Sequence, residues 1–369
     1  MVTQALRGPH SLYRRYQALL ESALTAAAFA VVVALTLDKA AVYPDKWLLV
    51  IGIGLAVVGI RWPLLAYSVA VVLLTYPVFL INFYLAVLFL AVSALGHRLF
   101  VHFFGATTLV LATPFLAEYQ LHWLVPILGG LWWGGATGAW VGGLSVMWLK
   151  MLAGMGGLNI DLLAIAGTGL DLQAVAANFA TANSLETLLL LIEPFAAESS
   201  VILYNLLQLL GFALAGGLVG LLAWRRWVKY SAPWSIMVVT AAGGLIMLAT
   251  MVGLPYWLNE AVAESTVLAT QDPVAPLFSL MIVIVVGTTV YTLRESLDLP
   301  VAPKRKVKVT ARPAAPKSSR RWFTRQPSPP ELLEEGEPVR RPVRVPHQSE
   351  LPEWEPPKKD SGLIMLEID

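Results

Sequence analysis

Residues 124–149 read LVPILGGLWWGGATGAWVGGLSVMWL, an uncharged apolar run with seven glycines among bulky tryptophans. Glycine weakens a helix by about 1 kcal/mol relative to alanine, so this run needs a reason to carry so many. Four of the glycines, Gly130, Gly134, Gly138 and Gly142, are spaced four apart and would share one face of a continuous helix. In lipid, such small-residue rows let helix backbones approach closely. The stretch therefore predicts a tightly packed membrane bundle.

A second segment repeats this spacing. Gly216 and Gly220 lie in YNLLQLLGFALAGGLVGLLAWRRW, residues 204–227. We expect both glycine-bearing segments to pack within the same bundle. Two arrangements of residues 122–152 remain open: one unbroken glycine-faced helix, or two helices that meet in a turn at WWGGATG, where glycine supplies unusual dihedral angles.

The composition places the whole chain in a membrane. Hydrophobic residues make up 57% of it and charged residues 14%, whereas soluble domains are about 25% charged. Between residues 47 and 149 the only formal charges are Arg61, Arg98 and Glu118. A spanning helix needs about 20 apolar residues. We therefore predict an all-α, polytopic transmembrane bundle of eight to ten spans, with ten favoured, on the apolar runs 18–37, 47–60, 63–80, 81–97, 99–117, 122–133, 136–152, 200–224, 232–255 and 275–293.

The distribution of basic residues predicts the orientation of these spans. Residues 151–199 and 254–293 contain acidic residues but no Lys or Arg, whereas WRRWVKY (224–230) is strongly basic. Cytoplasmic loops carry the excess of Lys and Arg. We expect both termini and the 224–230 loop to be cytoplasmic at the cell membrane, and both acidic segments to lie outside.

Four regions follow from this map. They are a cytoplasmic segment (1–16), N-terminal spans (17–97), a glycine-rich core with an outer loop at 151–199 (98–296), and a disordered cytoplasmic tail (297–369). The tail is rich in Pro, Lys, Arg, Glu and Ser, a composition that buries too little apolar surface to fold. Its basic stretch beside the last span favours contact with the lipid bilayer, and no nucleic acid is expected as a partner. Residues 300–369 end in SGLIMLEID, either a docking peptide for a membrane or cytoplasmic protein or an inert end.

The pattern VPILGGLWWGGATGAWVGGLSVMWL, together with residues 204–227, resembles the S components of energy-coupling-factor vitamin transporters and related bacterial multi-pass sensory modules. The resemblance covers about residues 98–294. It implies a six-helix core that binds a small solute. The chain departs from that family in its four additional N-terminal spans and its long tail.

Other residue patterns exclude most chemistry and leave one polar cluster. With no cysteine, the chain has no disulfide and no thiolate site. No zinc-protease or nucleotide-loop motif is present, so we expect no cofactor, no metal and no enzymatic activity. Ionisable and amide groups at the outer ends of spans are candidate ligand contacts, and the four that fall at one predicted depth are Lys150, Glu193, Asn205 and Gln208.

Two functions are consistent with the sequence. One is a small-solute-binding or transport component, with the 151–199 loop as a lid over the four polar residues. The other is a membrane anchor, sensor or scaffold whose cytoplasmic tail recruits a partner.

Overall fold

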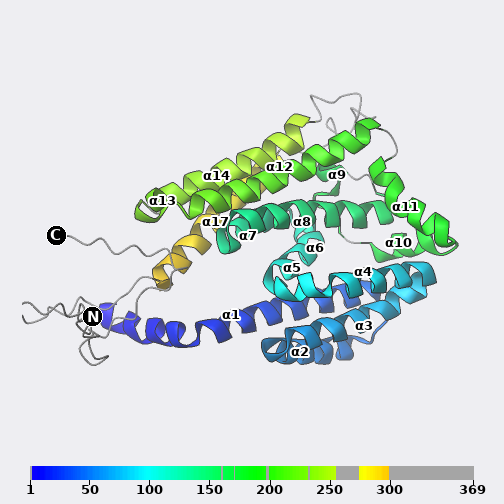
Figure 1. Ribbon diagram of the computed structural model, residues 1–369, viewed down its shortest axis with the longest axis horizontal. Coiled ribbons are helices and arrows are strands. Elements are labelled where there is room, and N and C mark those ends of the chain that lie inside the picture. Colours follow the sequence, from blue (N-terminus) through cyan, green and yellow to red (C-terminus); the bar gives the residue numbers. More distant parts are fainter. Residues whose placement is uncertain are drawn as a thin grey trace, which may run out of the picture. The chain divides into compact units, whose positions relative to one another are not determined.

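The computed structural model describes residues 2–158, 161–169, 171–196, 199–231, 233–254 and 274–298, and within them every regular element is a helix (Figure 1). The prediction of an all-α chain is confirmed for these residues. The tail and the acidic segment around residue 265 lie outside them. The helices are α1 (Val2–Ala40), α2 (Asp45–Arg61), α3 (Pro63–Ile81), α4 (Phe83–His102), α5 (Phe104–Leu111), α6 (Thr113–Glu118), α7 (Leu124–Trp133), α8 (Gly135–Met155), α9 (Leu162–Ile165), α10 (Leu172–Phe179), α11 (Ser184–Ala196), α12 (Ser199–Ala223), α13 (Arg226–Tyr230), α14 (Trp234–Leu248), the π-helix η1 (Ala249–Gly253) and α17 (Val274–Asp298).

Six of the described helices are long and apolar enough to cross a bilayer: α1, α3, α4, α12, α14 with η1, and α17. This supports an integral, multi-pass membrane protein, but the count of ten spans is not confirmed. The apolar run 99–117 is divided among the end of α4, α5 and α6, and Pro114 stands at the start of α6. Proline lacks the N–H that a continuing helix needs. Hydropathy alone therefore joined segments that the backbone separates.

Helices α7, α8, α12, α14 and α17 pack around the largest apolar core, to which Ile127, Phe212 and Val283 contribute fully buried side chains (Figure 1). A second apolar cluster joins α1, α2 and α3, with Phe29 and Leu37 at its centre. Many other large side chains on these helices are exposed. An apolar exterior of this kind suits lipid rather than water.

The glycine-rich stretch forms two helices. Gly134 separates α7 from α8 with φ +85° and ψ −176°, a conformation open to glycine but strained for other residues. A Cβ atom added at Gly138 would lie 2.5 Å from the Cα atom of Gly130, so the two helices fold back against each other. Helix α7 has ten residues and is about 15 Å long, half the thickness of a bilayer core.

The α7–α8 hairpin packs directly on α12 through glycines. A Cβ atom added at Gly220 would lie 2.5–2.6 Å from backbone atoms of Gly134 and Gly135. A Cβ atom at Gly130 or at Gly142 would overlap the carbonyl oxygen of Gly216 or of Phe212, respectively. All six glycines proposed for packing from the sequence therefore lie at the α7–α8–α12 contact. Backbones this close leave no room for side chains.

Two polar side chains fix the ends of helices. Asn82 accepts hydrogen bonds from the N–H groups of Tyr84 and Leu85 at 2.8 and 3.2 Å, and it donates to the carbonyls of Phe179 and Ala182 at 2.8 and 2.9 Å. It therefore starts α4 and ties it to the turn after α10.

Arg294 of α17 fixes the C-terminal end of α7. It donates to the carbonyls of Leu131 and Trp132 at 3.0 and 3.4 Å, and its guanidinium lies 4.9 Å from the Trp132 ring centre. These contacts cap the negative end of α7, which the break at Gly134 leaves without a following turn.

Candidate functional site

The most deeply buried charged group of the described residues is Lys150 on α8. Its side chain is 1% exposed, and its Nζ donates to Asn205 Oδ1 of α12 at 2.7 Å. The same ammonium lies 5.5 Å from the ring centre of Tyr204. Glycines bring α8 and α12 into backbone contact. The long side chain of Lys150 extends across this contact to α12.

Asp161 forms the other half of this cluster. It is 4% exposed and precedes α9, yet its side chain makes no capping bond to that helix. Its Oδ1 instead accepts from Tyr204 Oη at 2.6 Å and from Gln208 Nε2 at 3.1 Å, while its negative charge acts on the ammonium of Lys150. An aspartate in this position usually caps its own helix. Here α12 binds it and so holds part of the 151–199 segment against the bundle.

Tyr204 connects the members of the network, because its ring lies beside the Lys150 ammonium and its Oη bonds to Asp161. Gln208 Nε2 also donates to Tyr204 Oη, at 2.8 Å. Asn205 Nδ2 donates in turn to the carbonyl of Phe195 on α11 at 3.3 Å. Charged groups in an apolar interior need hydrogen-bond partners. In this cluster, which we call the Lys150 network, Asn205 accepts from the Lys150 ammonium, and Tyr204 and Gln208 donate to the Asp161 carboxylate.

The structure brings together three of the four residues that the sequence singled out. Lys150, Asn205 and Gln208 belong to the Lys150 network, whereas Glu193 is exposed on α11 and is not a hydrogen-bonding partner of the network. Sequence reasoning missed Tyr204 and Asp161. Tyr204 is four residues from Gln208 on the same helical face, a signal that could have been used.

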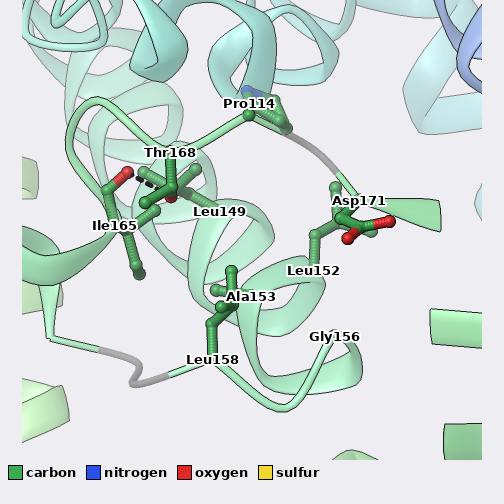
Figure 2. Close-up of a pocket in the computed structure, with 10 residues that line it drawn as sticks. Pro114, Leu149, Leu152, Ala153, Gly156, Leu158, Ile165, Thr168 and Asp171 are labelled. Carbon is green, nitrogen blue, oxygen red and sulfur yellow. Dashed lines mark hydrogen bonds between the residues drawn. The ribbon is translucent and has the colours of Figure 1, made fainter. Parts of the chain in front are cut away.

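A shallow pocket lies between α8 and the segment that follows it (Figure 2). Leu149, Leu152 and Ala153 line it from α8, and Ile165 lines it from α9. Thr168 donates to the carbonyl of Ile165 at 2.7 Å, and Asp171 lies at the rim. The volume of the pocket is about 20 Å³, none of the network residues lines it, and it has room for about one water molecule.

The 151–199 segment is folded rather than an open loop. It contains α9, α10 and α11, and the last two start at side-chain caps. Asp171 caps α10. Asn183 accepts from the N–H groups of Leu185 and Glu186 at 3.0 Å each, while Glu186 accepts from the N–H of Asn183 at 2.9 Å. This reciprocal pair is a capping box, and it sets α11 beside the start of α12.

The structure and the comparisons with known proteins add little chemistry beyond this site. Within the described residues, no group of three or more His, Asp or Glu side chains is placed to hold a metal ion. No protein-family model, curated protein or solved structure matches the chain.

Proposed function

We propose that the chain is a non-enzymatic membrane component that binds or transports a small solute at the Lys150 network. The buried Lys150–Asn205 contact beside Asp161 carries this proposal. Buried charges add little stability relative to apolar residues of the same size, and ionisable residues inside membrane bundles commonly mark binding or transport paths. The resemblance of residues 98–294 to solute-binding S components supports the same function.

The solute would exchange hydrogen bonds with the network. Lys150 supplies a cation, Asp161 an anion, and Asn205 and Gln208 supply amides. Because the two charges cancel, the site suits a neutral or zwitterionic solute better than one with a large net charge. Glu193 is not part of this proposal, since its side chain is exposed.

The test removes both charges together, so that no lone charge remains buried. In the double variant Lys150→Met/Asp161→Asn, we expect co-purified solute to disappear from native mass spectra. The matched control is Lys39→Met/Glu118→Gln, which removes a partly exposed ion pair of 3.5 Å that is not part of the network. The control should retain the solute. Equal retention by both variants, or no solute bound to the parent protein together with no thermal stabilisation by amino acids, vitamins or polyols, would refute the proposal.

Residues 297–369 support a second function, in which the tail of a membrane anchor, sensor or scaffold recruits a protein partner. The supporting observation is the apolar end SGLIMLEID after a long charged and proline-rich stretch. Deleting residues 361–369 should abolish partner capture from detergent extracts while leaving solute binding unchanged. Loss of solute binding in this deletion, with unchanged partner capture, would contradict the second function.

The orientation proposed from the Lys and Arg distribution places both termini in the cytoplasm. It also places the Lys150 network toward the outer surface, because Asp161 belongs to the segment without Lys or Arg.

A further inference from the structure

His122 is a buried polar group that the Lys150 network does not use. It lies between α6 and α7 and is 1% exposed, and within the described part of the chain neither of its ring nitrogens has a hydrogen-bond partner. Its ring stacks on Phe212 of α12, with centres 6.4 Å apart and planes 11° apart. The next residue, Trp123, donates to Met251 Sδ of η1 at 3.0 Å. The imidazole is thus held in place while its polar atoms are unsatisfied, which is costly in an apolar interior.

Gln208 has an unsatisfied acceptor atom. Its side chain is 0% exposed, and its Nε2 donates to Asp161 Oδ1 and Tyr204 Oη, which lie together on one side of the amide. These bonds fix which way the amide faces. Its Oε1 therefore points away from these two acceptors, and among the residues that the structure describes this oxygen has no donor.

The side chains of His122 and Gln208 lie on the same side of α12. Gln208 and Phe212 are four residues apart and so are neighbours on one helical face, and the His122 ring lies against Phe212. The π-helix η1 contacts both α12 and α9 at this end of the bundle. His122 and Gln208 are therefore both neighbours of Phe212.

We propose that a hydroxyl oxygen bridges His122 and Gln208 Oε1, and that it comes from a resident water or from the solute. A neutral imidazole has one N–H and one acceptor nitrogen. A hydroxyl oxygen accepts from that N–H and donates to Oε1 with one atom. An ammonium cannot accept, and a carboxylate cannot donate. The half of this inference that concerns the solute rests on the proposed function and identifies the ligand as hydroxyl-bearing.

This bridge extends the Lys150 network across the core, from Asp161 through Gln208 to His122. It also gives the buried imidazole a hydrogen-bond partner, since buried waters satisfy polar groups of this kind.

The test is magic-angle-spinning NMR of the full chain in lipid vesicles, with ¹⁵N-labelled histidine. The chain has five histidines, and His122→Phe identifies the signal by its loss. In the parent protein we expect magnetisation transfer from water to the His122 N–H. Gln208→Met should abolish this transfer, whereas Gln173→Met, at an exposed position of α10, should leave it unchanged. Lack of transfer in the parent protein, with ring shifts of an unbonded imidazole, would overturn the inference whether or not any variant folds.

Titration with ¹³C-labelled glycerol, whose carbon-bound protons do not exchange with water, distinguishes the two sources of the hydroxyl. Replacement of the water contact by a glycerol contact at His122 assigns the site to a solute hydroxyl. A water contact that glycerol leaves in place assigns it to a resident water. Transfer that persists in Gln208→Met would show that the oxygen does not bridge the two residues. Since solute binding at Lys150 is measured separately, failure here leaves the proposed function standing.

Discussion

Alanine at Gly138 should destabilise the protein, while alanine at Gly143 of the same helix should not. The new Cβ atom at Gly138 would lie 2.5 Å from the Cα atom of Gly130 and 2.6 Å from the carbonyl oxygen of Gly216. Both obstacles are backbone atoms of neighbouring helices, so α7 and α12 must each move away from α8. At Gly143 the nearest atom is Leu209 Cδ2, at 3.4 Å, an ordinary contact with a side chain that can turn.

The expected magnitudes follow from two opposing effects. Overpacking a closed interface costs about 1–3 kcal/mol, and rigid backbone favours the upper end. Alanine recovers about 1 kcal/mol of helix propensity at either site. We expect Gly138→Ala to lower the free energy of unfolding by about 2 kcal/mol and Gly143→Ala to raise it by up to about 1 kcal/mol. The difference of about 3 kcal/mol is roughly a 100-fold change in the unfolding equilibrium.

Unfolding in mixed micelles of increasing SDS content, followed by tryptophan fluorescence, measures both variants against the parent protein. Gly54→Ala is a further control, because a Cβ atom there meets nothing within 4 Å. If Gly138→Ala is as stable as Gly143→Ala, the backbone contact between the hairpin and α12 is not a determinant of stability, and the packing account is wrong.

Three further predictions concern other parts of the chain. Asn82→Asp keeps the cap of α4 but loses two donated bonds, so we expect about 2 kcal/mol of destabilisation and faster proteolysis at residues 180–183; unchanged proteolysis would contradict the role of Asn82. Arg294→Gln uncaps α7 and should lower the free energy of unfolding by about 1–2 kcal/mol, and equal melting temperatures would argue against this cap. Reporter fusions after residues 175, 228, 265 and 330 should read outside, inside, outside and inside, and an inside signal at 175 would reverse the proposed orientation.

Composition and small-residue spacing were sufficient to predict the helical class and to single out the glycines that meet at the seam. They could not predict how the backbone bends. Gly134 could continue a helix or end it, and only its positive φ shows that it ends α7. Hydropathy likewise reads residues 99–117 as one run, because it does not register where hydrogen bonding stops.

The site was less predictable, because depth in a membrane does not specify direction. Lys150, Asn205 and Gln208 share a depth and also meet, whereas Glu193 faces outward from an amphipathic helix. Asp161 was assigned to an outer loop. Its hydrogen-bond partners stand 43 and 47 positions later in the chain, and no local pattern carries that information.

The contact between Lys150 and Asn205 also sets an order of events during biosynthesis. The two residues are 55 positions apart, and ribosomes add about 5–20 residues per second, so α8 exists for roughly 3–11 s before Asn205 is made. A lysine at the centre of an inserting helix opposes insertion by about 2.5–3.5 kcal/mol, and the cost is smaller for Lys150, which is near the C-terminal end of α8. Asp161 is synthesised much sooner and is the first counter-charge that the nascent chain can offer. The α7–α8 hairpin therefore reaches its final position against α12 only after α12 has left the ribosome. A chain stalled before that point would expose the Lys150 charge to the membrane without its hydrogen-bond partner on α12.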